Sequence, residues 1–192
     1  MSKHLTAAAL VLASAGFMTV ATANTTNFAG TLSLTDPVFN RPVAGNPPII
    51  LSPTGTAVSY DVFPFFVNAV ASFTLQTLTA NLFPTPADDT FMVLYQTTFN
   101  PASPLINALQ ADDDNGVGAL SLITRSLVPG VQYYMVITTF NNSALGDYTG
   151  SIFTPGTEVA ILGAVPEPST ALLMLGGLGL AGFFAARRRQ RA

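Results

Sequence analysis

Residues 131–140 read Val-Gln-Tyr-Tyr-Met-Val-Ile-Thr-Thr-Phe, and β-branched and aromatic residues fill most of this run. Both kinds of residue are enriched in β-strands. Residues 91–96, Phe-Met-Val-Leu-Tyr-Gln, have a similar composition. Alternate side chains of a strand point to opposite faces, so Phe91, Val93 and Tyr95 should share one face, and Met92, Leu94 and Gln96 the other. The two segments predict a fold built on strands.

Further segments of this kind recur along the chain, and turn-forming Pro, Gly, Asn and Asp residues separate them. No stretch between the two ends of the chain has the 3.6-residue periodicity of an amphipathic helix. Strands at this spacing predict an all-β fold, an antiparallel β-sandwich of about seven or eight strands. Pro64 cannot donate to a strand ladder and should lie at an edge or a bulge. The additional predicted strands lie in residues 28–34, 60–67, 73–76, 120–122 and 148–152.

The N-terminal residues have the features of a secretory signal. Lys3 and His4 precede an apolar run over residues 5–20, and Ala21-Thr22-Ala23 fits the small-x-small rule for signal peptidase. We therefore predict a signal peptide over residues 1–23, with cleavage between Ala23 and Asn24. The alternative is a buried N-terminal helix. The chain has no cysteine and can form no disulfides, so an exported domain of this sequence must be stabilised by its core alone.

The C-terminal residues combine three parts in a fixed order. Pro166, Glu167 and Pro168 come first, an apolar run over about residues 170–186 follows, and residues 187–191 are Arg-Arg-Arg-Gln-Arg. At about 1.5 Å per residue the apolar run is a marginal transmembrane helix, and the arginines should stay cytoplasmic. We predict three parts of the chain: residues 1–23, an extracellular domain over residues 24–165, and residues 166–192.

This tail, with Val165–Thr170, the apolar run and the arginine cluster, resembles the PEP-CTERM sorting signal of Gram-negative bacteria. The resemblance implies recognition by an exosortase, a membrane transpeptidase, with cleavage near Pro166, Glu167 and Pro168. It also implies transient anchoring in the inner membrane, followed by delivery to the cell surface or to the exopolysaccharide matrix. The alternative is a plain membrane anchor behind a proline-rich linker.

The predicted domain over residues 24–165 is acidic. It holds two arginines, no lysine and nine acidic residues, hence a net charge of −7. Such a surface repels nucleic acid and anionic lipid, so we expect no nucleic-acid partner. The charge suits binding of a cation or contact with neutral glycans and other matrix components.

The same domain resembles the bacterial pre-peptidase C-terminal domain, a small β-sandwich appended to secreted proteases and surface proteins. The resemblance covers about residues 56–153 and implies an accessory module. A departure from that family is the longer segment over residues 99–110. The matching features are, in order, residues 60–67, 87–91, 93–95, 112–116, 129–134 and 146–149.

The candidate metal site is a run of acidic residues that starts at Asp112. Calcium prefers six to eight oxygen ligands, and carboxylate and amide groups on turns can supply several of them. The spacing is not that of an EF-hand, since Gly116 is fifth and Ile123 twelfth from the start of the run. The alternative is a solvated acidic turn without a metal. The candidate ligands for a calcium ion are Asp112, Asp113, Asp114 and Asn115, with Asp88 and Asp89.

The sequence gives little support to catalysis. His4 is the single histidine, Lys3 the single lysine, and there is no cysteine, so serine, cysteine and histidine-metal centres are not available to an exported domain. Paired carboxylates could still hydrolyse a glycosidic bond, with Asp88 or Asp89 opposite one of the acids at 112–114. We predict that the protein is not an enzyme.

Three tyrosines are candidates for a glycan platform. Tyr60, Tyr95 and Tyr148 could stack on sugar rings if they are exposed together. The alternative is ordinary packing of strands, which aromatic residues favour.

Overall fold

The computed structural model describes residues 23–84 and 88–163, and all of its regular elements are strands. The prediction of an all-β antiparallel fold is confirmed. Within the described residues, no helix has the length and apolar character needed to cross a membrane. The strands are β1 (Asn24–Leu32), β2 (Val38–Phe39), β3 (Val58–Ser59), β4 (Asp61–Val67), β5 (Ala71–Phe83), β6 (Thr90–Gln96), β7 (Ala108–Asp112), β8 (Leu122–Leu127), β9 (Tyr133–Thr139), β10 (Leu145–Thr154) and β11 (Ala160–Leu162).

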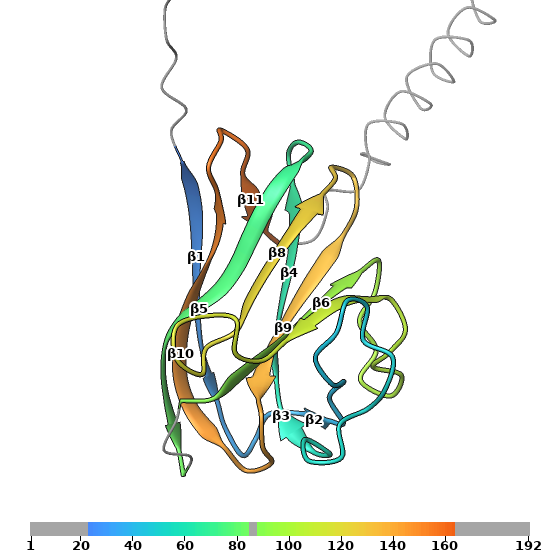
Figure 1. Ribbon diagram of the computed structural model, residues 1–192, viewed down its shortest axis with the longest axis vertical. Helices are drawn as coiled ribbons and strands as arrows, with labels where there is room; N and C mark the ends of the chain where they lie inside the picture. Colours follow the sequence, from blue (N-terminus) through green and yellow to red (C-terminus); the bar gives the residue numbers. More distant parts are fainter. Residues whose placement is uncertain (1–22, 85–87, 164–192) are drawn as a thin grey trace, which may run out of the picture.

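Two antiparallel sheets face each other (Figure 1). One sheet has the order β1-β10-β5-β8, and the other has the order β11-β4-β9-β6-β7. The small β2–β3 pair lies beside the second sheet at one end of the sandwich (Figure 1). The side chains of the two inner faces fill the space between sheets, as in other β-sandwiches.

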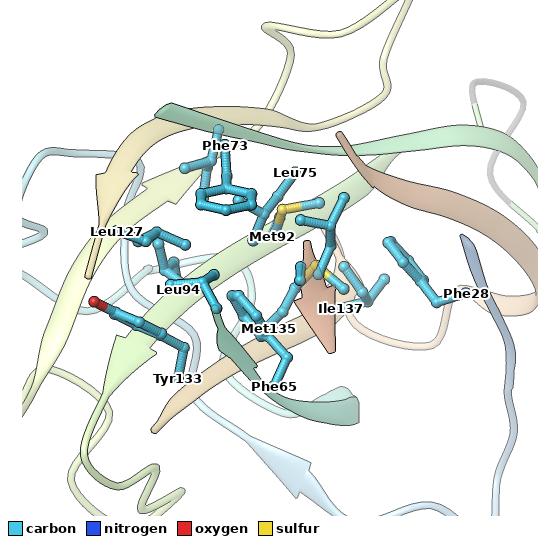
Figure 2. Packing of buried hydrophobic residues seen from close by; sticks show 14 of the residues in the cluster. Phe28, Phe65, Phe73, Leu75, Met92, Leu94, Leu127, Tyr133, Met135 and Ile137 are labelled. Carbon is cyan, nitrogen blue, oxygen red and sulfur yellow. The ribbon is translucent and has the colours of Figure 1, made fainter. Parts of the chain in front are cut away.

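The main core lies between the two sheets (Figure 2). Its largest members come from both layers and are almost fully buried. On β6, Met92 and Leu94 point into this core, as the alternation of the sequence predicts. The labelled side chains in Figure 2 are Phe28, Phe65, Phe73, Leu75, Met92, Leu94, Leu127, Tyr133, Met135 and Ile137.

A second cluster of buried residues covers the other face of the five-stranded sheet. Phe91, Val93 and Tyr95 of β6 point into it, so β6 is buried on both faces. The second face is covered by the chain between β2 and β3 and by the loop that carries Phe99, whose ring lies 4.8 Å from that of Tyr95. The longer segment over residues 99–110 thus has a structural role.

The strands missed by the sequence analysis are short or lie at sheet edges. β2, β3 and β11 have only two or three residues each, and β7 has five. Pro64 lies where β11 stops pairing with β4, because β11 covers only residues 65–67 of that strand. The N-terminal half of β4 is therefore an edge, as proline requires. A bulge at Leu78 interrupts the pairing of β5 with β10.

Hydrogen bonds between the sheets close the two edges of the sandwich. Thr26 of β1 donates from its hydroxyl to the carbonyl oxygen of Ala160 in β11, at 2.6 Å. At the opposite edge, Arg125 of β8 donates to the carbonyl oxygen of Leu109 in β7, at 3.1 Å. The beginning of β1 and the whole of β11 consequently lie at the same end of the molecule (Figure 1).

Several predicted features fall outside the described residues. They are the signal peptide before Ala23, the motif Pro166-Glu167-Pro168, and the apolar and basic segments after it. Of the predicted cleavage site, Ala23 is exposed and Asn24 is the first residue of β1. The division of the chain at residues 23 and 165 stays a prediction.

Candidate functional site: an acidic cluster beside a buried arginine

Three carboxylates meet at one end of the β6–β7 pair. Asp89 comes directly before β6, and Asp113 and Asp114 come directly after β7. The two strands are antiparallel, with Met92 opposite Asp112, so the start of one lies beside the end of the other. One oxygen from each of the three carboxylates lies within 4.8 Å of the others. The fold therefore brings together acids that are 24 residues apart in sequence.

Asp112 has a different role from its two neighbours. Its side chain is buried, with 3% exposed, and accepts hydrogen bonds from the main-chain N–H groups of Asn115 at 3.3 Å and Leu122 at 2.7 Å. The side-chain amide of Asn115 also donates to this carboxylate. Asp112 and Asn115 thus hold the turn after β7 and connect it to β8. They are not among the three residues whose oxygens converge.

The carboxylate of Asp88 is also hydrogen-bonded to the main chain. It has a φ of 48°, and its carboxylate accepts a hydrogen bond from the N–H of Leu82 at 2.9 Å. This contact ties the end of β5 to the residues before β6. Of the acid pairs considered for glycoside hydrolysis, the structure brings together Asp89 with Asp113 or Asp114.

The cluster is short of compensating partners. One carboxylate oxygen of Asp89 and one of Asp113 are buried without a hydrogen-bond partner. Burial, and then the charges of Asp114 and Asp89, raise the pKa of Asp113 to about 6. Burial and the charge of Asp114 likewise raise the pKa of Asp89. Crowded carboxylates resist ionisation in this way, and a bound cation or proton would relieve the repulsion.

A buried arginine is the nearest source of positive charge. Arg41 is 2% exposed, and its guanidinium lies 4.0 Å from the ring centre of Phe91 and 4.6 Å from that of Phe140. Its Nε and Nη2 donate to the carbonyl oxygen of Phe140 at 3.0 and 2.9 Å, and its Nη1 donates to that of Pro42 at 3.0 Å. Arg41 therefore fastens the chain between β2 and β3 onto the sheet.

The charge of Arg41 is coupled to the acidic cluster. Burial lowers the pKa of Arg41, and the charges of Asp113 and Asp89 act in the opposite direction. Gly55 lies so close that an added Cβ would be 2.5 Å from Nε of Arg41. In the sequence, Arg41 is one of the two arginines of residues 24–165, and no local pattern marks it as buried. The proximity of Phe91 and Phe140, 50 and 99 residues away, is not visible in a local pattern.

The burial of the three tyrosines excludes a glycan platform and supports the alternative, ordinary packing of strands. Tyr60 is 9% exposed, Tyr95 0% and Tyr148 2%. Tyr60 and Tyr95 belong to the second cluster, whereas Tyr148 belongs to the main core and donates to Asp61 at 2.6 Å. These rings stabilise strands and present no common surface.

Comparison with protein families identifies the tail. Residues 164–189 match the PEP-CTERM protein-sorting motif. Among curated proteins, no relative matches the chain. The resemblance of residues 56–153 to the pre-peptidase C-terminal domain stays a prediction. The motif implies export, membrane-associated sorting to the cell surface and processing by an exosortase. The prediction of this sorting signal is confirmed, and it marks the chain as a secreted protein sorted through an exosortase.

Proposed function

We propose that this protein is a non-catalytic component of the cell surface or exopolysaccharide matrix of a Gram-negative bacterium. The observation that carries the proposal is the match of residues 164–189 to the sorting motif, behind a described β-sandwich. The exosortase acts on the tail, and the sandwich is the part that remains at the surface. Its acidic composition favours neutral matrix components over nucleic acid.

The absence of a catalytic role is supported by the residue inventory. The chain has no cysteine, and its one histidine and one lysine lie in the first four residues. The remaining acidic cluster has two raised carboxyl pKa values and a buried arginine nearby. These features suit binding of a cation at least as well as proton transfer.

A variant of the motif tests the proposal. Replacing Pro166, Glu167 and Pro168 by alanine should abolish processing, so that full-length protein accumulates in the inner membrane. Glu158→Ala is the matched control, because Glu158 and Glu167 are the only two glutamates of the chain. The measurement is fractionation of the source cells with mass spectrometry of the mature C-terminus. Wild-type protein found intact in the inner membrane at steady state would contradict the proposal.

A second candidate function is calcium binding, favoured by the convergence of Asp89, Asp113 and Asp114. Each of the three carboxylates brings one oxygen to the cluster, and calcium would take the rest of its six to eight oxygen ligands from second carboxylate oxygens, main-chain carbonyls or water. Two of the three residues, Asp89 and Asp113, each have one buried oxygen without a hydrogen-bond partner, which supports this candidate. We infer that a calcium ion held here would join the start of β6 to the turn after β7.

Calcium should therefore raise the melting temperature of the purified protein. At 100 times the dissociation constant, the gain is about 2.7 kcal/mol, or roughly 5–10 °C for a domain of this size. The rise should shrink below about pH 6, because Asp113 is ionised above its pKa of about 6 and protons compete with the metal below it. Asp113→Asn should remove the effect and Glu158→Gln should keep it. An equal rise in both variants would assign it to nonspecific binding.

A further inference from the structure

The last described strand is attached to the sandwich up to the residue before the sorting motif. β11 (Ala160–Leu162) pairs with residues 65–67 of β4. The N–H of Gly163 then donates to the carbonyl oxygen of Pro64 at 2.7 Å, and the side-chain amide of Gln132 donates to the carbonyl oxygen of Gly163 at 3.3 Å. The matched motif begins at residue 164. No spacer separates the folded sandwich from the processing signal.

This arrangement leaves only a short length of chain between the sandwich and the bond that the enzyme would cleave. Pro166 is three residues after Gly163, and three extended residues span at most about 10–11 Å. The two sheets of a sandwich are themselves about 10 Å apart, before their outer side chains are counted. An active site in a membrane enzyme that holds a bond near Pro166 would therefore work within about 10–11 Å of Gly163, the last described residue hydrogen-bonded to the sandwich.

The residues before the cleaved bond are already hydrogen-bonded within the sandwich. Enzymes and domains that recognise extended peptides commonly bind the main chain over several residues, often as an added strand. On the N-terminal side of a bond near Pro166, those residues include β11. The main chain of Ile161 cannot pair with β4 and with an enzyme through the same groups.

We propose that β11 detaches from β4 when the exosortase engages the tail, and that residues 160–163 form the N-terminal part of the segment that the enzyme binds. This inference rests on the proposed function, since it concerns the same processing step. After processing, β11 returns to the sandwich and Ala160 again closes the core. The strength of the β11–β4 contact thus sets how readily the chain is processed.

The length, position and burial of β11 suit a strand that can detach from the sandwich. It has three residues and lies at the edge of its sheet. Ile161 and Leu162 are 41% and 38% exposed, so part of their apolar surface is already in contact with water before the strand leaves. Ala160 is buried, with 4% exposed, but its side chain is a single methyl group. The contacts of β11 with neighbouring strands include hydrogen bonds, such as that from Thr26 to Ala160, which water can replace, and Ala160 adds one methyl group to the main core.

A disulfide across the pair provides a direct test. Ala160 and Val67 are opposite each other, and the hydrogen bond from Gly163 to Pro64, three positions along the same register, places them in a non-hydrogen-bonded pair. The Cα atoms of such pairs are about 4.5 Å apart, which permits a disulfide. The chain has no other cysteine to interfere. We expect the double variant Ala160→Cys, Val67→Cys to lose processing while its disulfide is intact, and to regain it after brief treatment with dithiothreitol.

Thr74→Cys, Thr124→Cys is the matched control. These two threonines face each other across β5 and β8, with their hydroxyl oxygens 3.1 Å apart, so a disulfide there leaves β11 free. The control should be processed like the wild type, and each single cysteine variant should be too. The measurement is a pulse-chase in exosortase-bearing cells, with mass spectrometry of the disulfide and of the C-terminus.

The outcomes separate the two proposals. If the wild type is not processed at all, the proposed function fails. If the wild type is processed and the variant with an intact 160–67 disulfide is processed equally fast, the inference about β11 is wrong and the proposed function stands. A 160–67 variant that stays unprocessed after reduction would point to misfolding and would also overturn the inference, because reversal by dithiothreitol is part of it.

Discussion

Replacing Arg41 with alanine is expected to lower the free energy of unfolding by about 3–5 kcal/mol, the range found when one partner of a buried charge network is removed. Three donors of its guanidinium satisfy the carbonyl oxygens of Phe140 and Pro42. Without them, these acceptors lose their partners, the rings of Phe91 and Phe140 lose the group between them, and Asp89 and Asp113 lose the nearest positive charge.

Arg125 is the matched control, because it is the only other arginine between residues 23 and 163. It is half-buried, and it bonds the side chain of Asn46 at 2.7 Å and the carbonyl oxygen of Leu109. Its replacement by alanine should cost about 1 kcal/mol. Urea unfolding of the purified variants gives both values. Equal losses would show that the full burial of Arg41 adds nothing to what a half-buried arginine contributes.

Phe65→Ala should have an effect of similar size, about 3–5 kcal/mol, as expected for a phenylalanine truncated in a well-packed core. Phe65 is 0% exposed and stacks on Tyr133, with ring centres 5.5 Å apart and an angle of 29° between the planes. It lies in β4, which pairs with both β9 and β11, so the cavity would form where three strands meet.

The comparison for this variant is Phe83→Ala. Phe83 is the last residue of β5 and is 80% exposed. Substitutions at such surface positions usually change stability by no more than about 0.5 kcal/mol. Thermal or urea unfolding of both variants measures the contrast. A loss at Phe83 as large as that at Phe65 would mean that residue 83 is buried in the protein in solution.

The main strands could be predicted from composition and alternation because these patterns are local. β6 and β9 are recognised by their β-branched and aromatic residues, and the edge position of Pro64 follows from its missing donor. The second cluster could not be predicted. The chain between β2 and β3 covers this cluster, and it has no periodic pattern that would predict its position. Contacts between residues far apart in sequence, such as that between Arg41 and Phe140, hold it there.

The sequence predicted which acidic residues could form the candidate site, but not which of them lie close together. In sequence, Asp112, Asp113 and Asp114 look alike, and so do Asp88 and Asp89. Successive side chains of a strand point to opposite sides, and Asp112 is the last residue of β7, so it turns inward to cap the turn while its neighbours do not. Which acids converge is decided by the pairing of β6 with β7, and local sequence does not encode that pairing.

The burial of Arg41 has a consequence for survival outside the cell. Proteases of trypsin specificity cut after lysine or arginine, and residues 23–163 contain no lysine and two arginines. One of them is sealed between two aromatic rings, and the other lies within β8, in a paired strand instead of an exposed loop tip where nicking concentrates. A folded sandwich of this kind offers such enzymes no bond in an exposed loop, which should slow its cleavage by trypsin-like proteases at the cell surface.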